Sequence, residues 1–235
     1  ISGMLRIADL LETRSTGSTA ALVEGATGVG LAWADVAAQA DRWEAARLPG
    51  PVGLALADPV AMAANFVAAL RAGVLVAPLD PAAPAGDHAA RIAELGLRAV
   101  VVEAGTDAPT GVEVWTAGRR DLHLAGGTAG PARALPESPA GARLIMASSG
   151  TTGTPKIIPV TESQLLDTAA GVAGHLELDP DDRGYSPLPL FHINGLVVGV
   201  LSALVAGSTI VLERQFSRRS FWATVEQRRA TWLNL

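Results

Sequence analysis

The chain has 235 residues, a net charge of −5, 17% charged residues and no cysteine. The low charged fraction argues against a disordered chain. The acidic balance, without a cluster of lysine and arginine, argues against a nucleic-acid partner. The absence of cysteine excludes disulfides, thiolate metal sites and a cysteine nucleophile. We therefore expect one or two globular domains with a substantial core.

The N-terminal segment lacks the basic-then-apolar order of a secretory signal, and residues 1–3 before Met4 are expected to be a cloning remnant. Residues 185–212 carry no Asp, Glu, Lys or Arg, which raises the alternative of a membrane span. Pro187 and Pro189 lie in the first third of this run and leave too short an apolar stretch. We expect a cytoplasmic protein without a membrane partner.

The first half of the chain alternates strand-like runs with helical patterns. Its elements follow in order: a strand at 52–57, a helix that begins at Asp58-Pro59 and ends at Gly73, a strand at 74–77, a helix at 87–95 and a strand at 99–102. This β-α-β-α-β order predicts a parallel sheet that is buried on both faces. Residues 103–140 are rich in glycine and proline and predict strand fragments joined by an irregular linker.

A second unit is predicted from residue 141 onward. Its elements are a strand at 143–147, a helix from about 162 to 176, a buried helix at 196–206, a strand at 208–212, a helix at 220–229 and an apolar run at 231–235. Thr161 and Gln164 predict a capping box at the start of the first helix. We expect an α/β fold of parallel-rich sheets with helices on both faces, in two subdomains at residues 4–140 and 141–235.

The most informative stretch is a loop of hydroxyls and glycines that ends on a lysine: Ser148, Ser149, Gly150, Thr151, Thr152, Gly153, Thr154, Pro155 and Lys156. Glycines let backbone amides approach an anion, hydroxyls add donors, and lysine adds a positive charge. The pattern fits neither the Walker A loop nor the motifs of serine acyl enzymes. We predict a phosphate-binding loop, and a flexible connector is the alternative.

This loop resembles the signature phosphate loop of the adenylate-forming superfamily, which includes acyl-CoA synthetases, luciferases and adenylation domains. Three further stretches resemble family segments in the same order: residues 31–36, residues 70–81 with the pattern L-x-A-G-x-x-x-x-P-L-D, and residues 187–196 with the pattern P-L-F-H-x-x-G. The last pattern is closest to acyl- and aryl-CoA ligases. The resemblance covers nearly the whole chain.

The resemblance implies an enzyme that joins ATP and a carboxylic acid into an acyl-adenylate and releases pyrophosphate. Mg²⁺ would arrive with ATP, and the acyl group would pass to the thiol of CoA or of a carrier protein's phosphopantetheine arm. The loop residues from Ser148 to Thr154 would hold ATP, with phosphate contacts from Ser149, Gly150, Thr151, Thr152 and Gly153. Lys156 would hold the loop or the pyrophosphate. Its alternative role is a surface lysine paired with a carboxylate.

By the same resemblance, Phe191 and His192 would line the acyl pocket beside the reacting carboxylate, and the alternative is a packed core histidine. Asn194 and Gly195 either contribute to substrate binding or shape the turn into the next helix. Thr151, Lys156 and His192 are the residues expected to act in catalysis. No protein-built metal site is expected, and the aspartates at 179, 181 and 182 predict a solvated turn.

Three positions depart from the family pattern: Ile157 replaces a glycine, Ala147 stands where many members have tyrosine, and Glu162 stands where histidine is common. They leave open a non-catalytic homologue that binds nucleotide or a partner chain. A carrier-protein-loading enzyme is the other alternative. Family members continue into a ribose-binding aspartate and a small C-terminal domain with a catalytic lysine. We expect these 235 residues to be the front part of such an enzyme.

Overall fold

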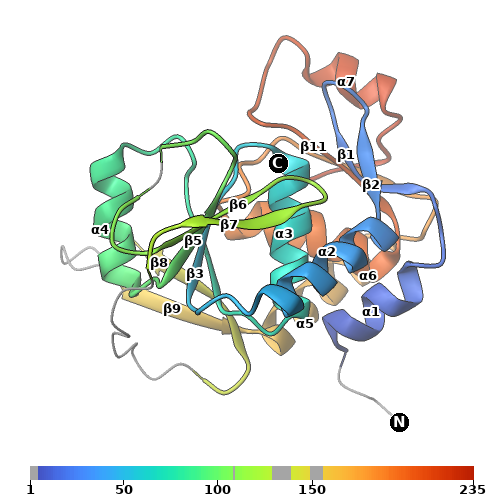
Figure 1. Cartoon of the computed structure of the whole chain (residues 1–235). Coiled ribbons are helices and arrows are strands. Elements are labelled where there is room, and N and C mark those ends of the chain that lie inside the picture. Colours follow the sequence, from blue (N-terminus) through green and yellow to red (C-terminus); the bar gives the residue numbers. More distant parts are fainter. Residues whose placement is uncertain (1–4, 108, 129–138, 149–155) are drawn as a thin grey trace.

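The computed structural model describes residues 5–107, 109–128, 139–148 and 156–235 and contains a larger and a smaller β-sheet (Figure 1). The larger sheet has the strand order β7-β6-β5-β3-β4-β8-β9. Its strands are β3 (Val52–Ala55), β4 (Val76–Pro78), β5 (Ala99–Val102), β6 (Glu113–Ala117), β7 (Leu122–Gly126), β8 (Ala142–Ser148) and β9 (Lys156–Thr161). The inner strands pair in parallel, and β7 and β9 add antiparallel edges.

Both faces of the larger sheet are buried at its inner strands β3 and β5, which explains the continuous apolar runs in these strands. On β5, Ala99 and Val101 face one hydrophobic cluster, and Val100 and Val102 face another. Helix α3 (Pro59–Arg71) packs in the first cluster, and α4 (Ala85–Leu95) packs in the second. Figure 1 shows α3 in the middle of the molecule and α4 at its outer left side.

The smaller sheet has the strand order β12-β10-β11-β1-β2. Its strands are β1 (Ala20–Glu24), β2 (Gly30–Ala32), β10 (Arg183–Ser186), β11 (Thr209–Leu212) and β12 (Trp232–Leu233). The remaining helices are α1 (Ile7–Arg14), α2 (Trp33–Ala46), α5 (Glu162–His175), the π-helix η1 (Gly195–Leu201), α6 (Ser202–Ala206) and α7 (Phe221–Gln227). Phe221 on α7 packs with Tyr185, Val23 and Val211 on the outer face of this sheet.

The two sheets combine segments from both ends of the chain. Strand β1 pairs in parallel with β11, with Leu22 opposite Ile210. Strand β8 pairs in parallel with β4, with Leu144 opposite Val76. The boundary predicted near residue 140 therefore does not separate the sheets, because each sheet takes strands from both sides of it.

Two predicted helix starts, those of α3 and α5, are confirmed by side-chain hydrogen bonds. Asp58 caps α3, because its Oδ1 accepts from the amides of Val60 and Ala61 at 2.9 and 3.1 Å. The capping box at α5 is present: Gln164 N donates to Thr161 Oγ1 at 3.2 Å, and Thr161 N donates to Gln164 Oε1 at 2.9 Å. The two sheets, with α3 and α4 on opposite faces of the larger one, agree with the expected α/β fold.

Several predicted elements differ from the observed ones, and for three of them the structure gives a reason. The strand expected at 74–77 is β4 at Val76–Pro78, because the turn that ends α3 uses Gly73 with φ +74° and a bond from Val74 N to Ala69 O. The helix expected at 220–229 ends at Gln227, because Arg229 adopts a left-handed φ of 53°. The helix expected at 196–206 is a π-helix followed by a short α-helix, a distinction that apolar content does not encode.

No described helix is both long enough and apolar enough to cross a membrane.

Candidate active site

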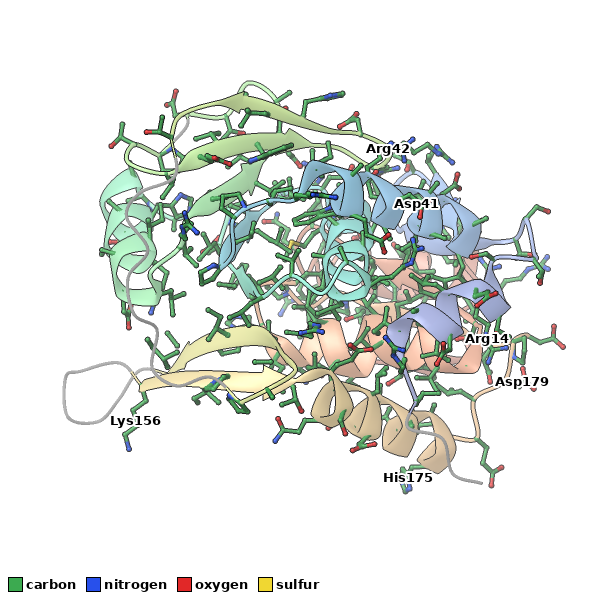
Figure 2. All side chains as sticks on the ribbon, turned by 60° about the horizontal axis from the view of Figure 1, so that its bottom comes forward. Arg14, Asp41, Arg42, Lys156, His175 and Asp179 are labelled. Atoms are coloured by element: carbon green, nitrogen blue, oxygen red, sulfur yellow. The ribbon has the colours of Figure 1, made fainter. Side chains whose placement is uncertain are left out.

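The loop predicted to bind phosphate lies between the paired ends of two antiparallel strands. Ser148 ends β8, Lys156 begins β9, and the two residues are register partners. Seven predicted loop residues lie outside the described part of the chain: Ser149, Gly150, Thr151, Thr152, Gly153, Thr154 and Pro155. Lys156 is exposed and forms no ion pair with a described residue. Figure 2 shows its side chain pointing away from the body of the protein.

Phe191 and His192 lie in the turn that follows β10. Their rings are 4.5 Å apart between centroids and tilted by 50°. The backbone amide of His192 donates to Pro189 O at 3.1 Å, which closes the turn. His192 is exposed and Phe191 is half-buried. A packed core histidine therefore does not describe His192, and its ring is accessible to a ligand.

A central cavity of about 430 Å³ is lined both by β8, the strand that leads into the predicted phosphate loop, and by the Phe191–His192 turn. Ile145, Met146 and Ala147 of β8 line it on one side, and Phe191 and His192 line it on another. The segment that follows the carboxyl end of β4 and one face of α4 complete its wall. Ligands in α/β proteins commonly bind beyond the carboxyl ends of parallel strands. The cavity occupies such a position, beside the predicted phosphate loop.

The central cavity is also lined by polar and charged residues that sequence reasoning did not assign to a site: Asp80, Asp87, His88, Arg91 and Glu94. The ring of His88 contacts the Asp80 carbonyl oxygen through Nε2 at 2.7 Å. Arg91 donates to Glu94 at 2.7 Å. Asp80 belongs to the family-like stretch 70–81, which was the available signal. No motif marked His88, Arg91 and Glu94 of α4.

Asn194 and Gly195 occupy different environments. Asn194 is exposed and lines a groove of about 640 Å³ with apolar residues of β9, α5 and η1. Within this groove, Ile158 and Ile193 are 47% and 40% exposed. Gly195 is buried, and a Cβ there would lie 3.0 Å from Leu190 Cδ2 and 3.3 Å from Pro189 O. A side chain at position 195 would therefore disturb the Phe191–His192 turn.

The three departures from the family pattern each have a structural setting. Ala147 lines the central cavity. Ile157 packs against the hydrophobic cluster beneath α4. Glu162 accepts a hydrogen bond from Ile7 N at 2.9 Å and lies 3.6 Å from Arg143 Nε, so it ties the N-terminal helix to β8. The carboxylate of Glu162 therefore has a structural role in this chain, because it links two elements of the fold.

Glu213, which follows β11, is a titratable residue next to Phe191 that no motif marked. The two residues line the same small space, about 40 Å³ in volume. Burial raises the pKa of Glu213, the Glu24 carboxylate raises it further, and Arg228 opposes both. Burial also raises the pKa of Tyr185 to about 12.

No group of three or more histidine or carboxylate side chains suited to a metal occurs among the described residues. As predicted, the aspartates at 179–182 form a turn, in which Asp181 N donates to Asp179 Oδ1 at 2.7 Å and Asp179 N donates to Asp182 Oδ2 at 2.9 Å. A Mg²⁺ ion bound at the candidate active site would need oxygen ligands from a nucleotide or from residues outside the described part.

The two sheets and the helices that cover them define an α/β fold. Residues 15–235 match the family model described as AMP-binding enzyme, and the chain belongs to this family. This result confirms the resemblance on which the sequence predictions relied.

The chain is similar to several CoA ligases, both among relatives and among solved structures. Sulfoacetate–CoA ligase from Cupriavidus necator is 38% identical over 143 residues, which cover 60% of this chain and 28% of that protein. Oxalate–CoA ligase from Arabidopsis thaliana is 28% identical over 212 residues, which cover 78% and 39%. A malonyl-CoA ligase complex with methylmalonyl-CoA and AMP matches with a TM-score of 0.78 and 25% identity, over 96% of this chain and 48% of that one. The chain thus spans less than half the length of these proteins.

Proposed function

We propose that this chain is part of an AMP-forming ligase that activates a carboxylic acid with ATP and passes the acyl group to the thiol of CoA. The central cavity carries the proposal, because its walls include both the strand that leads into the loop and the Phe191–His192 turn. A phosphate site and a substrate site must lie side by side for acyl-adenylate formation. Membership of the AMP-binding family and the CoA-ligase relatives support the same reaction.

The chemistry that we assign to the loop is electrostatic. Transfer of the adenylyl group places negative charge on the pyrophosphate that leaves, so donors already in position stabilise it. Lys156 supplies the positive charge, and the amides and hydroxyls from Ser148 to Thr154 supply the other donors. An exposed lysine with no carboxylate partner among the described residues fits this role. Mg²⁺ brought in with ATP would offset the remaining phosphate charge.

The role that we assign to the turn is to bind and orient the carboxylic acid. The exposed ring of His192 can donate a hydrogen bond to a carboxylate oxygen. Phe191 and the apolar residues of β8 cover the other side of the central cavity and reduce its access to water. The thiol of CoA or of a carrier protein would then attack the acyl carbon of the adenylate, so that a thioester forms as the acyl–phosphate bond breaks and AMP leaves.

Lys156 is the only lysine in the sequence, which makes the nucleotide part of the proposal directly testable. A lysine-selective acylating reagent should modify Lys156 and the N-terminal amine of the chain. MgATP should protect Lys156 from modification and leave the N-terminal amine reactive. Equal labelling with and without MgATP would contradict the assignment of Lys156 to the phosphate site.

The acid and the acceptor are tested with the protein extended to the length of its relatives. ATP–pyrophosphate exchange is measured with short acids that carry a second acidic group, as in the relatives' names, and with fatty acids. We expect Lys156→Gln to lower exchange about 100-fold or more, since single charge-stabilising donors contribute on this scale. The matched control is Arg218→Gln, which removes an exposed cation elsewhere and should leave exchange unchanged. Thioester formation with CoA but not with a carrier protein would support the CoA assignment.

A further inference from the structure

A cavity of about 330 Å³ lies at one end of the strands of the smaller sheet, and the Phe191–His192 turn lies at the other end. Ala20 and Ala21 at the start of β1 line it, as does Ser208, which directly precedes β11. It therefore lies at the amino ends of these parallel strands, whereas the turn follows the carboxyl end of β10. We call it the amino-edge cavity. Figure 2 shows Arg14, which lines it, on the opposite side of the molecule from Lys156.

Three residues that line this cavity each have a buried donor atom without a hydrogen-bond partner among the described residues. These atoms are Arg14 Nε, Trp33 Nε1 and Ser208 Oγ. Trp33 is 4% exposed and Ser208 is 2% exposed. Buried polar groups nearly always have a partner, and leaving one unpaired is unfavourable. An indole nitrogen can only donate, so the missing partner of Trp33 must be an acceptor.

The guanidinium of Arg14 is fixed in the wall by two features of the fold. Its Nη2 donates to Val205 O at 2.7 Å, at the carboxyl end of α6. Its Cζ would lie 2.8 Å from a Cβ at position 207, where the chain has glycine with φ +76°. No described carboxylate lies within ion-pair distance of Arg14. The amino-edge cavity is therefore lined by a positive charge that forms no ion pair with a described carboxylate, although Asp181 also lines the cavity.

We infer that the amino-edge cavity binds a small monocarboxylate, independently of the proposed ligase site. A carboxylate only accepts hydrogen bonds, and its negative charge complements Arg14. Small side-chain movements would bring its two oxygens within reach of the buried donors. Asp181, which is exposed and also lines the cavity, disfavours a more highly charged anion such as phosphate. The volume is at the lower end of the range for small-molecule sites.

The indole N–H of Trp33 provides a direct probe of this site. In a ¹H–¹⁵N spectrum of the chain, its resonance is assigned with Trp33→Phe and then followed during titration with acetate and propionate. We expect a saturable shift that chloride at equal ionic strength does not produce and that phosphate produces only weakly. Arg14→Gln should weaken acetate binding about tenfold or more, because it removes charge-assisted hydrogen bonds. The matched control Arg219→Gln removes an exposed arginine elsewhere and should bind acetate as the wild type does.

A second readout uses the coupling between binding and stability. Acetate should raise the melting temperature of the wild type and of Arg219→Gln, but not that of Arg14→Gln. Ser208→Ala, which removes a donor without changing charge, provides the same test if Arg14→Gln does not fold. The proposal is overturned if the Trp33 resonance does not respond to acetate, if chloride shifts it equally, or if both variants retain wild-type affinity. Water alone in the cavity would give the first of these results.

Discussion

Helices α3 and α4 cover opposite faces of the larger sheet, but their surroundings differ. Every residue of α3 from Pro59 to Leu70 is buried, because the helix also contacts β1 and helices α1 and α2. On α4 only Ile92 and Leu95 are buried, and polar residues of this helix face the central cavity. The comparison shows that α3 holds the two sheets together, whereas α4 contributes one wall of the candidate site.

The largest difference between the helices should appear when a core side chain is removed. Phe66 on α3 is completely buried, and Phe66→Ala should cost about 4 kcal/mol of unfolding free energy, since both the transfer and the cavity terms are large. Ile92→Ala on α4 should cost about 2 kcal/mol, because Ile92 is at the edge of its cluster and 8% exposed. Urea unfolding of the chain measures both values. Equal losses would contradict the proposed difference.

A buried polar network on α3 should give the next largest effect. Asn65 Oδ1 accepts from Trp43 Nε1 at 2.9 Å and from Gln39 Nε2 at 2.8 Å. Asn65→Ala leaves these two buried donors without that acceptor and should cost about 2–3 kcal/mol. The control Gln215→Ala removes an exposed amide and should change the free energy by less than about 0.5 kcal/mol. Denaturant midpoints that shift equally in both variants would show that the network is not stabilising.

The helix starts offer a smaller test. Asp58→Ala removes the cap of α3 and its bond to Arg119 Nε at 2.8 Å, and should cost about 1–2 kcal/mol. On α4, Gly86→Ala should instead stabilise the chain by about 0.5 kcal/mol, because nothing lies within 4 Å of the added Cβ. Thermal unfolding distinguishes the two directions. A melting temperature that falls in both variants would refute the Gly86 prediction.

The smallest effect concerns acid stability near the start of α3. A hydrogen bond from Arg119 lowers the pKa of Glu24, with a further bond from Thr27 and with burial opposing. A lowered pKa stabilises the fold above the unfolded value of 4.5, and this contribution is lost as the pH falls through the folded value. Arg119→Met should therefore reduce stability by up to about 1 kcal/mol at pH 7. The deficit should shrink on acidification, and a constant deficit in urea unfolding between pH 7 and strongly acidic pH would contradict this cause.

Local signals in the sequence predicted much of the fold. The Asp58 cap and the Thr161–Gln164 capping box depend on residues within one helical turn, and both were found where expected. The pairing of β1 with β11 was not predicted, because Leu22 and Ile210 are far apart in the chain and no local pattern links them. The π-helix was missed because its apolar content is the same as that of an α-helix.

The sequence predicted part of the candidate site, as it predicted part of the fold. The sequence marked Lys156, Phe191 and His192 through their motifs, and the structure places Phe191 and His192 on one cavity with β8. The contributions of His88 and Arg91 depend on how α4 packs beside that cavity, which no motif indicated. The catalytic roles assigned to Thr151, Lys156 and His192 remain predictions.

The sequence by itself determined the starts of α3 and α5 and the buried strand runs, and it predicted a phosphate loop, because each of these depends on neighbouring residues. Only the tertiary structure decided which segments meet. Arg14, Trp33 and Ser208 belong to no common motif, and they line one cavity because β1 and β11 pair and α1 packs against α6. Such contacts depend on closing long loops and on burying many side chains together, and a local pattern does not contain that information.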